Sequence, residues 1–129
     1  VARQNVGDYG LSERINVVAS DVFMGLAGQR YDLILSNPPY VSDDAIANFP
    51  PEHRAEPVLA HAGGCDGLDI VRRILKEARQ HLTPDGALIV EIGTGRELLE
   101  AEYPDLPFLW LDTENSEGEV FALPASALP

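Results

Sequence analysis

The chain has 129 residues and a formal net charge of -12 at pH 7, and this length suits one domain. The acidity argues against direct nucleic-acid binding, which depends on cationic side chains that neutralise phosphates. It is compatible with a basic protein partner and with a role in solubility alone. We expect no signal sequence and no membrane span, because no apolar run approaches the ~20 residues that a span needs. The single cysteine, Cys65, cannot form an internal disulfide, which indicates a reducing cytosol and a cytoplasmic protein.

The first forty residues predict a helix and two strands. Residues 1–9 have helical character, with Gly10 as the stop signal. Residues 15–19 form a β-branched run that predicts a strand, and Ser20-Asp21-Val22-Phe23 follows at its carboxyl end. After the turn-rich residues 24–30, the apolar run 31–36 predicts a buried strand of a parallel sheet.

Asn37-Pro38-Pro39-Tyr40 directly follows this second strand. Ligands of open α/β sheets bind at the carboxyl ends of strands, so the position makes the motif a candidate site. Neither proline has an N–H, and the Asn37 side-chain oxygen and the Pro38 carbonyl can together accept both hydrogens of a planar amino group. Tyr40 can lie against the flat face of that group. The alternative is a polyproline turn that only ends the strand.

The later residues predict a long connection and then helices alternating with strands. Residues 41–65 show no periodicity, as is typical of a binding loop, apart from a short helix through residue 49. Asp66 is expected to cap a helix over residues 67–82, and residues 83–86 to form the turn before a strand over 87–92. A short helix over 93–103 and an antiparallel strand pair over 107–111 and 119–123 follow, so the predicted fold is α/β.

Several motifs occur in a defined order along nearly the whole chain: Ser20-Asp21-Val22-Phe23, Asn37-Pro38-Pro39-Tyr40-Val41, Glu56-Pro57, Gly63-Gly64-Cys65-Asp66-Gly67-Leu68 and Glu91-Ile92-Gly93. In this order they resemble the HemK-like protein-glutamine N5-methyltransferases. Trp110 and Gly118-Glu119-Val120-Phe121 are similar to the PrmB branch, which methylates a glutamine of a large-subunit ribosomal protein. Asn-Pro-Pro-Tyr by itself also occurs in DNA adenine-N6 methyltransferases, so only the full series narrows the family.

The resemblance implies a partial Rossmann-like sheet of the class I S-adenosylmethionine-dependent methyltransferases, with a C-terminal antiparallel strand pair. It implies that Asn37, Pro38, Pro39 and Tyr40 bind the substrate, and that Asn37, Pro38 and Tyr40 are the catalytic residues that hold and orient the glutamine amide. It also implies that Asp21, Val22 and Phe23, with Asn37, bind S-adenosylmethionine; the alternative role for Asp21 is a helix cap.

The implied partner is a basic ribosomal protein of the large subunit, or a release factor, that carries the target glutamine. No strong base and no metal are implied. His53, His61 and His81 lack the spacing of metal ligands, and we expect them on the surface or in loops. We interpret Cys65 as structural or incidental because no basic residue beyond His61 lies near it in the sequence.

The Gly-rich cofactor loop and the N-terminal substrate domain of the family have no counterpart in this sequence. We therefore expect residues 1–129 to be the C-terminal part of the catalytic domain. The strands at 15–19 and 31–36 would then lack neighbours, and unpaired strand edges favour self-association. The chain alone is expected to bind the cofactor poorly and to be inactive.

Two other interpretations stay open. Gly93-Thr94-Gly95 follows a predicted strand and Asp112 ends the next one, an order that would fit a permuted adenine methyltransferase with its cofactor loop after its Asn-Pro-Pro-Tyr motif. The second interpretation is a non-catalytic interaction module that keeps the methyltransferase fold, because one fold can serve many functions.

Overall fold

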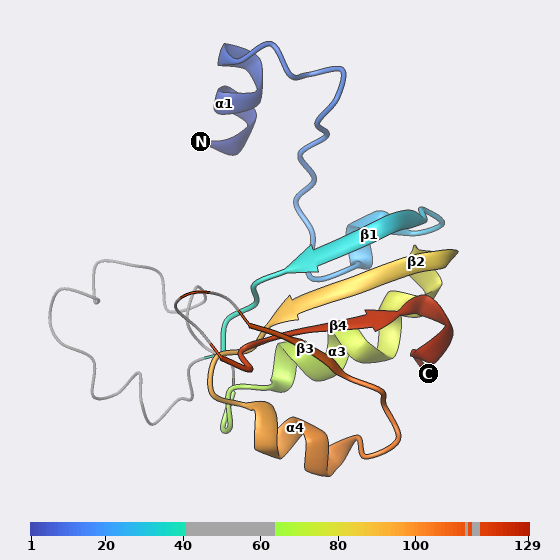
Figure 1. Cartoon of the computed structure of the whole chain (residues 1–129). Coiled ribbons are helices and arrows are strands. Elements are labelled where there is room, and N and C mark those ends of the chain that lie inside the picture. Colours follow the sequence, from blue (N-terminus) through green and yellow to red (C-terminus); the bar gives the residue numbers. More distant parts are fainter. Residues whose placement is uncertain (41–63, 113, 115–116) are drawn as a thin grey trace, which may run out of the picture.

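A four-stranded sheet is the framework of the protein (Figure 1). The computed structural model describes residues 1–40, 64–112, 114 and 117–129. β1 (Tyr31–Ser36) runs parallel to β2 (Leu82–Glu91), and β4 (Val120–Pro124) pairs antiparallel with both β2 and β3 (Leu109–Leu111). The strand order is β1-β2-β4-β3. The predicted α/β class and the C-terminal antiparallel pair are confirmed, as in a partial Rossmann-like sheet.

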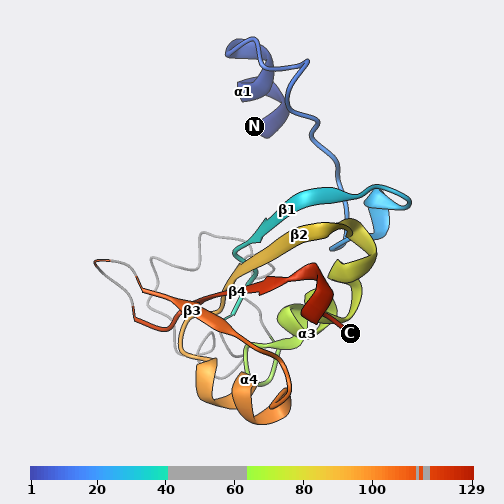
Figure 2. The same ribbon diagram turned by 45° about the vertical axis from the view of Figure 1, so that its right-hand side comes forward.

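The helices cover the β2 and β4 part of the sheet. α3 (Asp69–Glu77) continues into the 3-10 helix η4 (Ala78–His81), and α4 (Arg96–Glu102) leads to β3. Figure 2 shows α3 directly below β2 and β4, with α4 farther from β1. Alternate side chains of the two central strands are buried with one face of α3 and with α4, and they form the core: Leu88, Val90, Phe121, Leu123, Val71, Ile74, Leu75 and Leu99.

β1 is an edge strand in the described part of the chain. Its predicted bounds and its parallel pairing are confirmed, but the prediction that it is buried is wrong, since Leu33 is 49% and Leu35 68% exposed. The reason is that β1 has one hydrogen-bonded neighbour there, and only Ile34 packs against the core. An edge of unpaired N–H and C=O groups is open to another strand.

Residues 15–19 do not form the predicted strand. A strand needs a neighbour to satisfy its backbone groups, and no described residue pairs with this segment. Ile15 and Val18 are exposed as a result. The helix α1 (Ala2–Asp8) forms as predicted before Gly10, which has φ +64, and it stands away from the sheet at the end of this segment (Figure 1).

The predicted helix over 67–82 has different bounds in the structure. Gly67 has φ +84, outside the helical region, so α3 begins only at Asp69. The prediction that Asp66 caps the helix is wrong, because Leu68 is at the N-cap and no side chain caps α3. Asp66 Oδ1 instead accepts the Leu68 N–H at 3.0 Å, in the turn that precedes the helix. The helix then tightens into η4 after Glu77.

The predicted turn over 83–86 lies inside β2 as a bulge. Tyr31 is opposite Leu82, whereas Leu33 is opposite Ala87, so β2 has extra residues at this point. Beyond the bulge the register is regular through Ser36 and Val90. The residues that follow β1 and β2 therefore leave the sheet side by side.

Other predictions fall outside the described residues, namely the short helix starting at Ser42-Asp43-Asp44, the Glu56-Pro57 motif, Gly63, His53 and His61. Within the described ranges, no helix has the length and apolar content to cross a membrane.

Candidate functional site

The two candidate motifs of the N-terminal part meet at one pocket. This pocket has a volume of about 840 Å³ and lies between residues 20–26, β1 and α3. Asp21, Val22 and Phe23 form one part of its wall, and Pro38 and Pro39 form another. The remaining lining residues are Ser20, Leu26, Ile34, Leu35, Ser36, Ile70, Arg73 and Ile74. The structure thus brings the predicted cofactor-binding residues next to part of the predicted substrate-binding motif.

Local hydrogen bonds shape the Ser20–Phe23 segment, which does not follow a strand as predicted. The Ser20 hydroxyl donates to the Val22 carbonyl at 2.9 Å and accepts the Gly25 N–H at 2.7 Å. Val22 has φ +48, in the left-handed region that β-branched residues rarely adopt. Such a conformation persists only where the surroundings hold it, and here the Ser20 bonds and the buried Phe23 do so.

Asp21 forms an ion pair with Arg73 of α3 at the mouth of the pocket. Arg73 Nη2 donates to Asp21 Oδ2 at 2.9 Å, and this hydrogen bond is the main reason that the pKa of Asp21 is lowered. Because the Asp21 side chain is 61% exposed, the pair contributes little to stability but keeps the carboxylate ionised. The alternative role of Asp21 as a helix cap is not seen, since η1 (Met24–Leu26) has Phe23 at its N-cap and no side-chain capping bond.

Sequence reasoning missed Arg73. Its helical spacing places it beside Ile70 and Ile74, which also line the pocket, so the face of the helix could be found from the sequence. No local signal indicates that this face meets Asp21, which lies 52 positions away.

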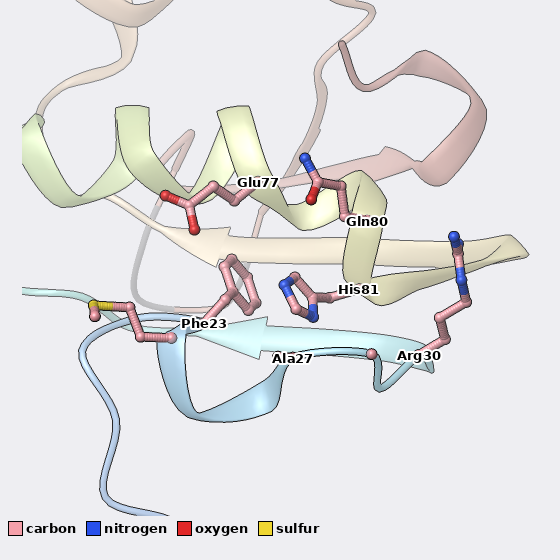
Figure 3. Close-up of a pocket in the computed structure, with 8 residues that line it drawn as sticks. Phe23, Ala27, Arg30, Glu77, Gln80 and His81 are labelled. Atoms are coloured by element: carbon pink, nitrogen blue, oxygen red, sulfur yellow. The ribbon is translucent and has the colours of Figure 1, made fainter.

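Phe23 is fixed from behind by His81 (Figure 3). The two rings stack with their centroids 4.6 Å apart and an interplanar angle of 9°, beside a second pocket of about 520 Å³. His81 Nδ1 lies 3.2 Å from the Gln29 carbonyl oxygen, so this nitrogen carries the proton. The prediction that His81 lies on the surface is wrong: it is 9% exposed, and burial is tolerated because its N–H has an acceptor.

The Asn37-Pro38-Pro39-Tyr40 motif is divided between the pocket and its surroundings. Asn37 is exposed and Pro38 is buried. Tyr40 lies beyond the pocket, against the end of β2, with its hydroxyl 3.5 Å from Glu91 Oε1. Burial, followed by the negative charge of Glu91, raises the pKa of Tyr40. Pro38 and Pro39 therefore line the same pocket as Asp21, whereas Asn37 and Tyr40 do not line it.

The residues of the permuted interpretation have packing roles in the structure. A Cβ at Gly93 would meet the Tyr40 ring at 2.8 Å, and one at Gly95 would meet Leu68 Cδ2 at the same distance. Asp112 Oδ1 accepts the Gly118 N–H at 3.1 Å, in the connection between β3 and β4. None of Gly93, Gly95 and Asp112 lines the pocket, so the geometry favours the unpermuted interpretation.

The lining of the pocket combines apolar side chains with one carboxylate. Val22, Phe23, Leu26 and Ile70 supply apolar surface for a flat ring, and the Asp21 carboxylate can accept from an exocyclic amine. Asp21 is the one acidic residue among the described residues that line the pocket, so no second carboxylate there can bind a ribose. Cys65 is exposed, and no group of three metal-binding side chains occurs in the described ranges.

Comparison with known proteins identifies relatives along almost the whole chain. No protein-family model matches it. The chain is 59% identical over 128 residues to the ribosomal protein uL3 glutamine methyltransferase of Bradyrhizobium diazoefficiens, which covers 99% of the chain and 40% of that protein. The protein of the same name from Neisseria gonorrhoeae is 52% identical over 95% of the chain and 41% of its own length. That from Burkholderia pseudomallei is 47% identical over 100% of the chain and 44% of its length.

The chain thus spans about 40% of the length of the curated relatives that it matches. The match includes the motifs at both walls of the pocket, because it covers 99% of the chain. The chain is therefore homologous to a segment of the ribosomal protein uL3 glutamine methyltransferases, in agreement with the family that its motifs resemble.

Proposed function

We propose that the full protein containing this chain is a protein-glutamine N5-methyltransferase that uses S-adenosylmethionine. The observation that carries this proposal is the pocket at the end of β1, where Asp21, Val22 and Phe23 face Pro38 and Pro39. The relatives are named for uL3, which makes this ribosomal protein of the large subunit the first substrate to test. The charge of -12 supports a basic protein partner over DNA, and a ribosomal substrate implies a cytoplasmic reaction.

In this proposal the motif after β1 holds the glutamine amide. The Asn37 side-chain oxygen and the Pro38 carbonyl accept its two N–H groups, and the Tyr40 ring lies beside it. The amide nitrogen is a poor nucleophile because its lone pair is delocalised, so acceptors that orient it and stabilise positive charge on its N–H groups favour reaction. S-adenosylmethionine supplies an electrophilic methyl group carried on a sulfonium. The nitrogen would form its bond to the methyl carbon as the carbon–sulfur bond breaks and leaves its electron pair on sulfur as a neutral thioether. The methylated nitrogen would then be acidic and lose one proton to solvent, so no strong base is needed.

On the other wall, Asp21 accepts from the exocyclic amine of the adenine, and Val22 and Phe23 pack against the ring. Arg73 supports this role because it keeps Asp21 ionised and therefore available only as an acceptor. The ion pair uses Asp21 Oδ2, which leaves Oδ1 as the second acceptor of a carboxylate that lines the pocket.

The proposal extends to the arrangement of the full protein. Residues 1–129 would be the C-terminal part of the catalytic domain, and the remaining length of the relatives would carry the Gly-rich cofactor loop and the substrate domain. Additional strands would pair with the free edge of β1, cover Leu33 and Leu35, and give residues 15–19 a place in the sheet. The 129-residue chain alone would then bind the cofactor poorly, and low-micromolar binding in calorimetry would contradict this.

Methyl transfer by the full-length protein tests the function. It is incubated with S-adenosylmethionine labelled in its methyl group and with uL3, a release factor or a DNA duplex containing adenine. We expect label on one uL3 glutamine by mass spectrometry, and none on a uL3 variant in which that residue is alanine. Label on DNA, or on none of the three, would overturn the proposal.

The acceptor role of Asn37 is tested by the Asn37→Ala variant. We expect turnover to fall about 100-fold or more, because the amide loses one of its two acceptors. Asn5→Ala is the matched control, since Asn5 is also an exposed asparagine but lies in α1, away from both the pocket and the motif after β1.

A further inference from the structure

We propose that Glu91 and Gly93, at the carboxyl end of β2, are positioning residues that hold the Tyr40 ring at the rim of the site. The role of the ring in binding the glutamine amide rests on the proposed function. Its attachment to β2 rests on its contacts with Glu91 and Gly93. Neither Glu91 nor Gly93 lines the pocket.

The sheet register brings the two segments together. β1 and β2 are parallel with Ser36 opposite Val90, so the chain after Ser36 leaves the sheet beside Glu91. Glu91 is fixed from its other side by pairing with Val120 of β4, and the Ile92 N–H donates to the Glu119 carbonyl at 2.8 Å. The end of β2 is therefore held on both sides, and it lies next to residues 37–40, which follow β1.

Gly93 forms the surface on which the ring rests. A Cβ at this position would lie 2.8 Å from Tyr40 Cδ2 and 2.9 Å from Cε2, closer than side chains approach one another. Gly93 also has φ +56, a conformation in which a Cβ is strained. Glycine is thus required here both by the backbone and by the ring above it.

The ring is held at its other two ends. The Tyr40 hydroxyl donates to Glu91 Oε1 over 3.5 Å, and the pKa of Tyr40 is raised by its burial and then by the negative charge of Glu91. At the main chain, a Cβ on Gly67 would overlap the Tyr40 carbonyl oxygen, so this turn also packs closely against Tyr40. Hydroxyl, ring face and backbone are each in contact with a different residue.

The Gly67 turn is itself anchored to two helices. Arg72 of α3 donates to Asp66 Oδ2 at 2.6 Å and to Glu102 Oε2 of α4 at 2.8 Å. Asp66 immediately precedes Gly67, so this network fixes the turn that supports the Tyr40 backbone. The ring consequently has support from β2 and from both helices, although β1, the strand before it, is at the edge of the sheet that the described residues form.

Methyl transfer by variants of the full-length protein tests the role of Gly93. Gly93→Ala is expected to lower turnover by about 10-fold or more, because small displacements of orienting groups have large effects on rate. Gly10→Ala is the matched control: Gly10 has φ +64, but a Cβ there meets nothing within 4 Å, and turnover should change less than about 2-fold. Should Gly93→Ala fail to fold, Gly93→Asn adds the same Cβ in a residue that tolerates this backbone.

Nuclear magnetic resonance provides a readout that does not depend on activity. In the full-length protein, Tyr40 ring protons should show nuclear Overhauser contacts to the Gly93 α protons, with the signals assigned through Tyr40→Phe. In Glu91→Gln the titration midpoint of Tyr40 should move down towards the ordinary value for tyrosine, because the neighbouring negative charge is lost. Tyr103, whose pKa is raised by its own burial and by Glu102, serves as the internal reference that should not move.

The two readouts separate the failure of each proposal. Altered Tyr40 signals in a protein that transfers no methyl group would leave the positioning of the ring intact and refute the function. Methyl transfer with Tyr40 signals unchanged in both Gly93→Ala and Glu91→Gln would refute the positioning roles and leave the function intact.

Discussion

Residues 1–40 and residues 64–129 differ in how they are stabilised. Among the described residues of the first region, Phe23 is the one hydrophobic residue that belongs to the buried core, whereas all the others lie between Leu68 and Leu128. Yet the first region supplies most of the pocket wall, including Asp21-Val22-Phe23 and the two prolines Pro38 and Pro39. Most of the candidate site thus lies in the region that contributes the fewest buried hydrophobic residues.

The consequence is that the site depends on a few contacts with the second region. These contacts are the pairing of β1 with β2, the stack of Phe23 on His81, the Asp21–Arg73 ion pair and the support of Tyr40 by Glu91 and Gly93. Substitutions can weaken each contact separately. Their effects on stability show whether the two regions are stabilised differently.

The largest difference is expected between the core and the edge of the sheet. Phe121→Ala should lower the free energy of unfolding by about 3–5 kcal/mol, because it removes a buried ring and leaves a cavity. The Phe121 ring also packs edge-on against Phe108 and Trp110, at 5.0 and 5.7 Å between centroids. In the 129-residue chain, where Leu35 is exposed, Leu35→Ala should change the same quantity by less than about 0.5 kcal/mol. Urea unfolding measures both, and similar losses would mean that β1 is as well packed as β4.

A smaller effect is expected where Phe23 joins the second region. His81→Ala should lower the free energy of unfolding by about 1–3 kcal/mol, because it removes an aromatic stack and the hydrogen bond to Gln29. Gln80→Ala, at an exposed neighbour that lines the same second pocket, is the control and should have little effect. If thermal unfolding gave the two variants the same stability, the stack would not connect the regions.

The Arg72 network within the second region should give a pH-dependent effect. Arg72, through its hydrogen bonds, lowers the pKa of Asp66 to about 2, below the ordinary value of 3.8. A carboxyl whose pKa is depressed on folding stabilises the fold above its ordinary pKa, and this contribution is lost as the pH falls through the folded value. Because Asp66 is 35% exposed and screened, we expect a loss of about 0.5–1 kcal/mol between about pH 5 and pH 2.

Thermal unfolding of Arg72→Met at several pH values checks this prediction. The variant should be less stable than the unmodified protein at neutral pH and should lose less on acidification, whereas Lys76→Met on the same helix should keep the original pH profile. Parallel acid profiles for the unmodified and Arg72→Met proteins would show that the ion pairs do not contribute.

The smallest effect on stability is expected at Asp21. Arg73→Ala should leave unfolding almost unchanged, since the pair is exposed, but the pKa of Asp21 should rise towards 3.8 when its hydrogen-bond donor is lost. Carbon-13 resonance of the Asp21 carboxyl follows this titration, and an unchanged midpoint would mean that the pair is not formed in solution.

The elements that could be predicted are those with local signals. The apolar run 31–36 gives the bounds of β1, and Gly10 and Gly95 stand at the ends of their helices. Residues 15–19 carry an equally clear strand signal, but a strand exists only with a partner, and the described residues offer none. The sequence of a segment therefore indicates a preference for extended structure, but a strand forms only where a neighbouring strand can pair with it.

The candidate site shows the same limit. Asn37-Pro38-Pro39-Tyr40 and Asp21-Val22-Phe23 could be selected from chemistry and position, and Pro38 and Pro39 do meet the second motif at the pocket. The contacts of Arg73, His81 and Gly93 could not be predicted, because each is made with a residue more than fifty positions away. Their roles depend on packing between elements, which periodicity and turn residues do not encode.

The bulge at residues 83–86 determines where this protein tolerates changes in length. Side chains alternate along a strand, so one residue inserted or deleted between Ala87 and Glu91 would turn Glu91 to the opposite face and shift the end of β2 by about 3.3 Å. The same change within Thr83–Gly86 would enlarge or shrink a loop that already departs from the ladder, and Ser36 would stay opposite Val90. The chain can therefore vary in length at the bulge within β2 while the pairing beside Tyr40 stays the same.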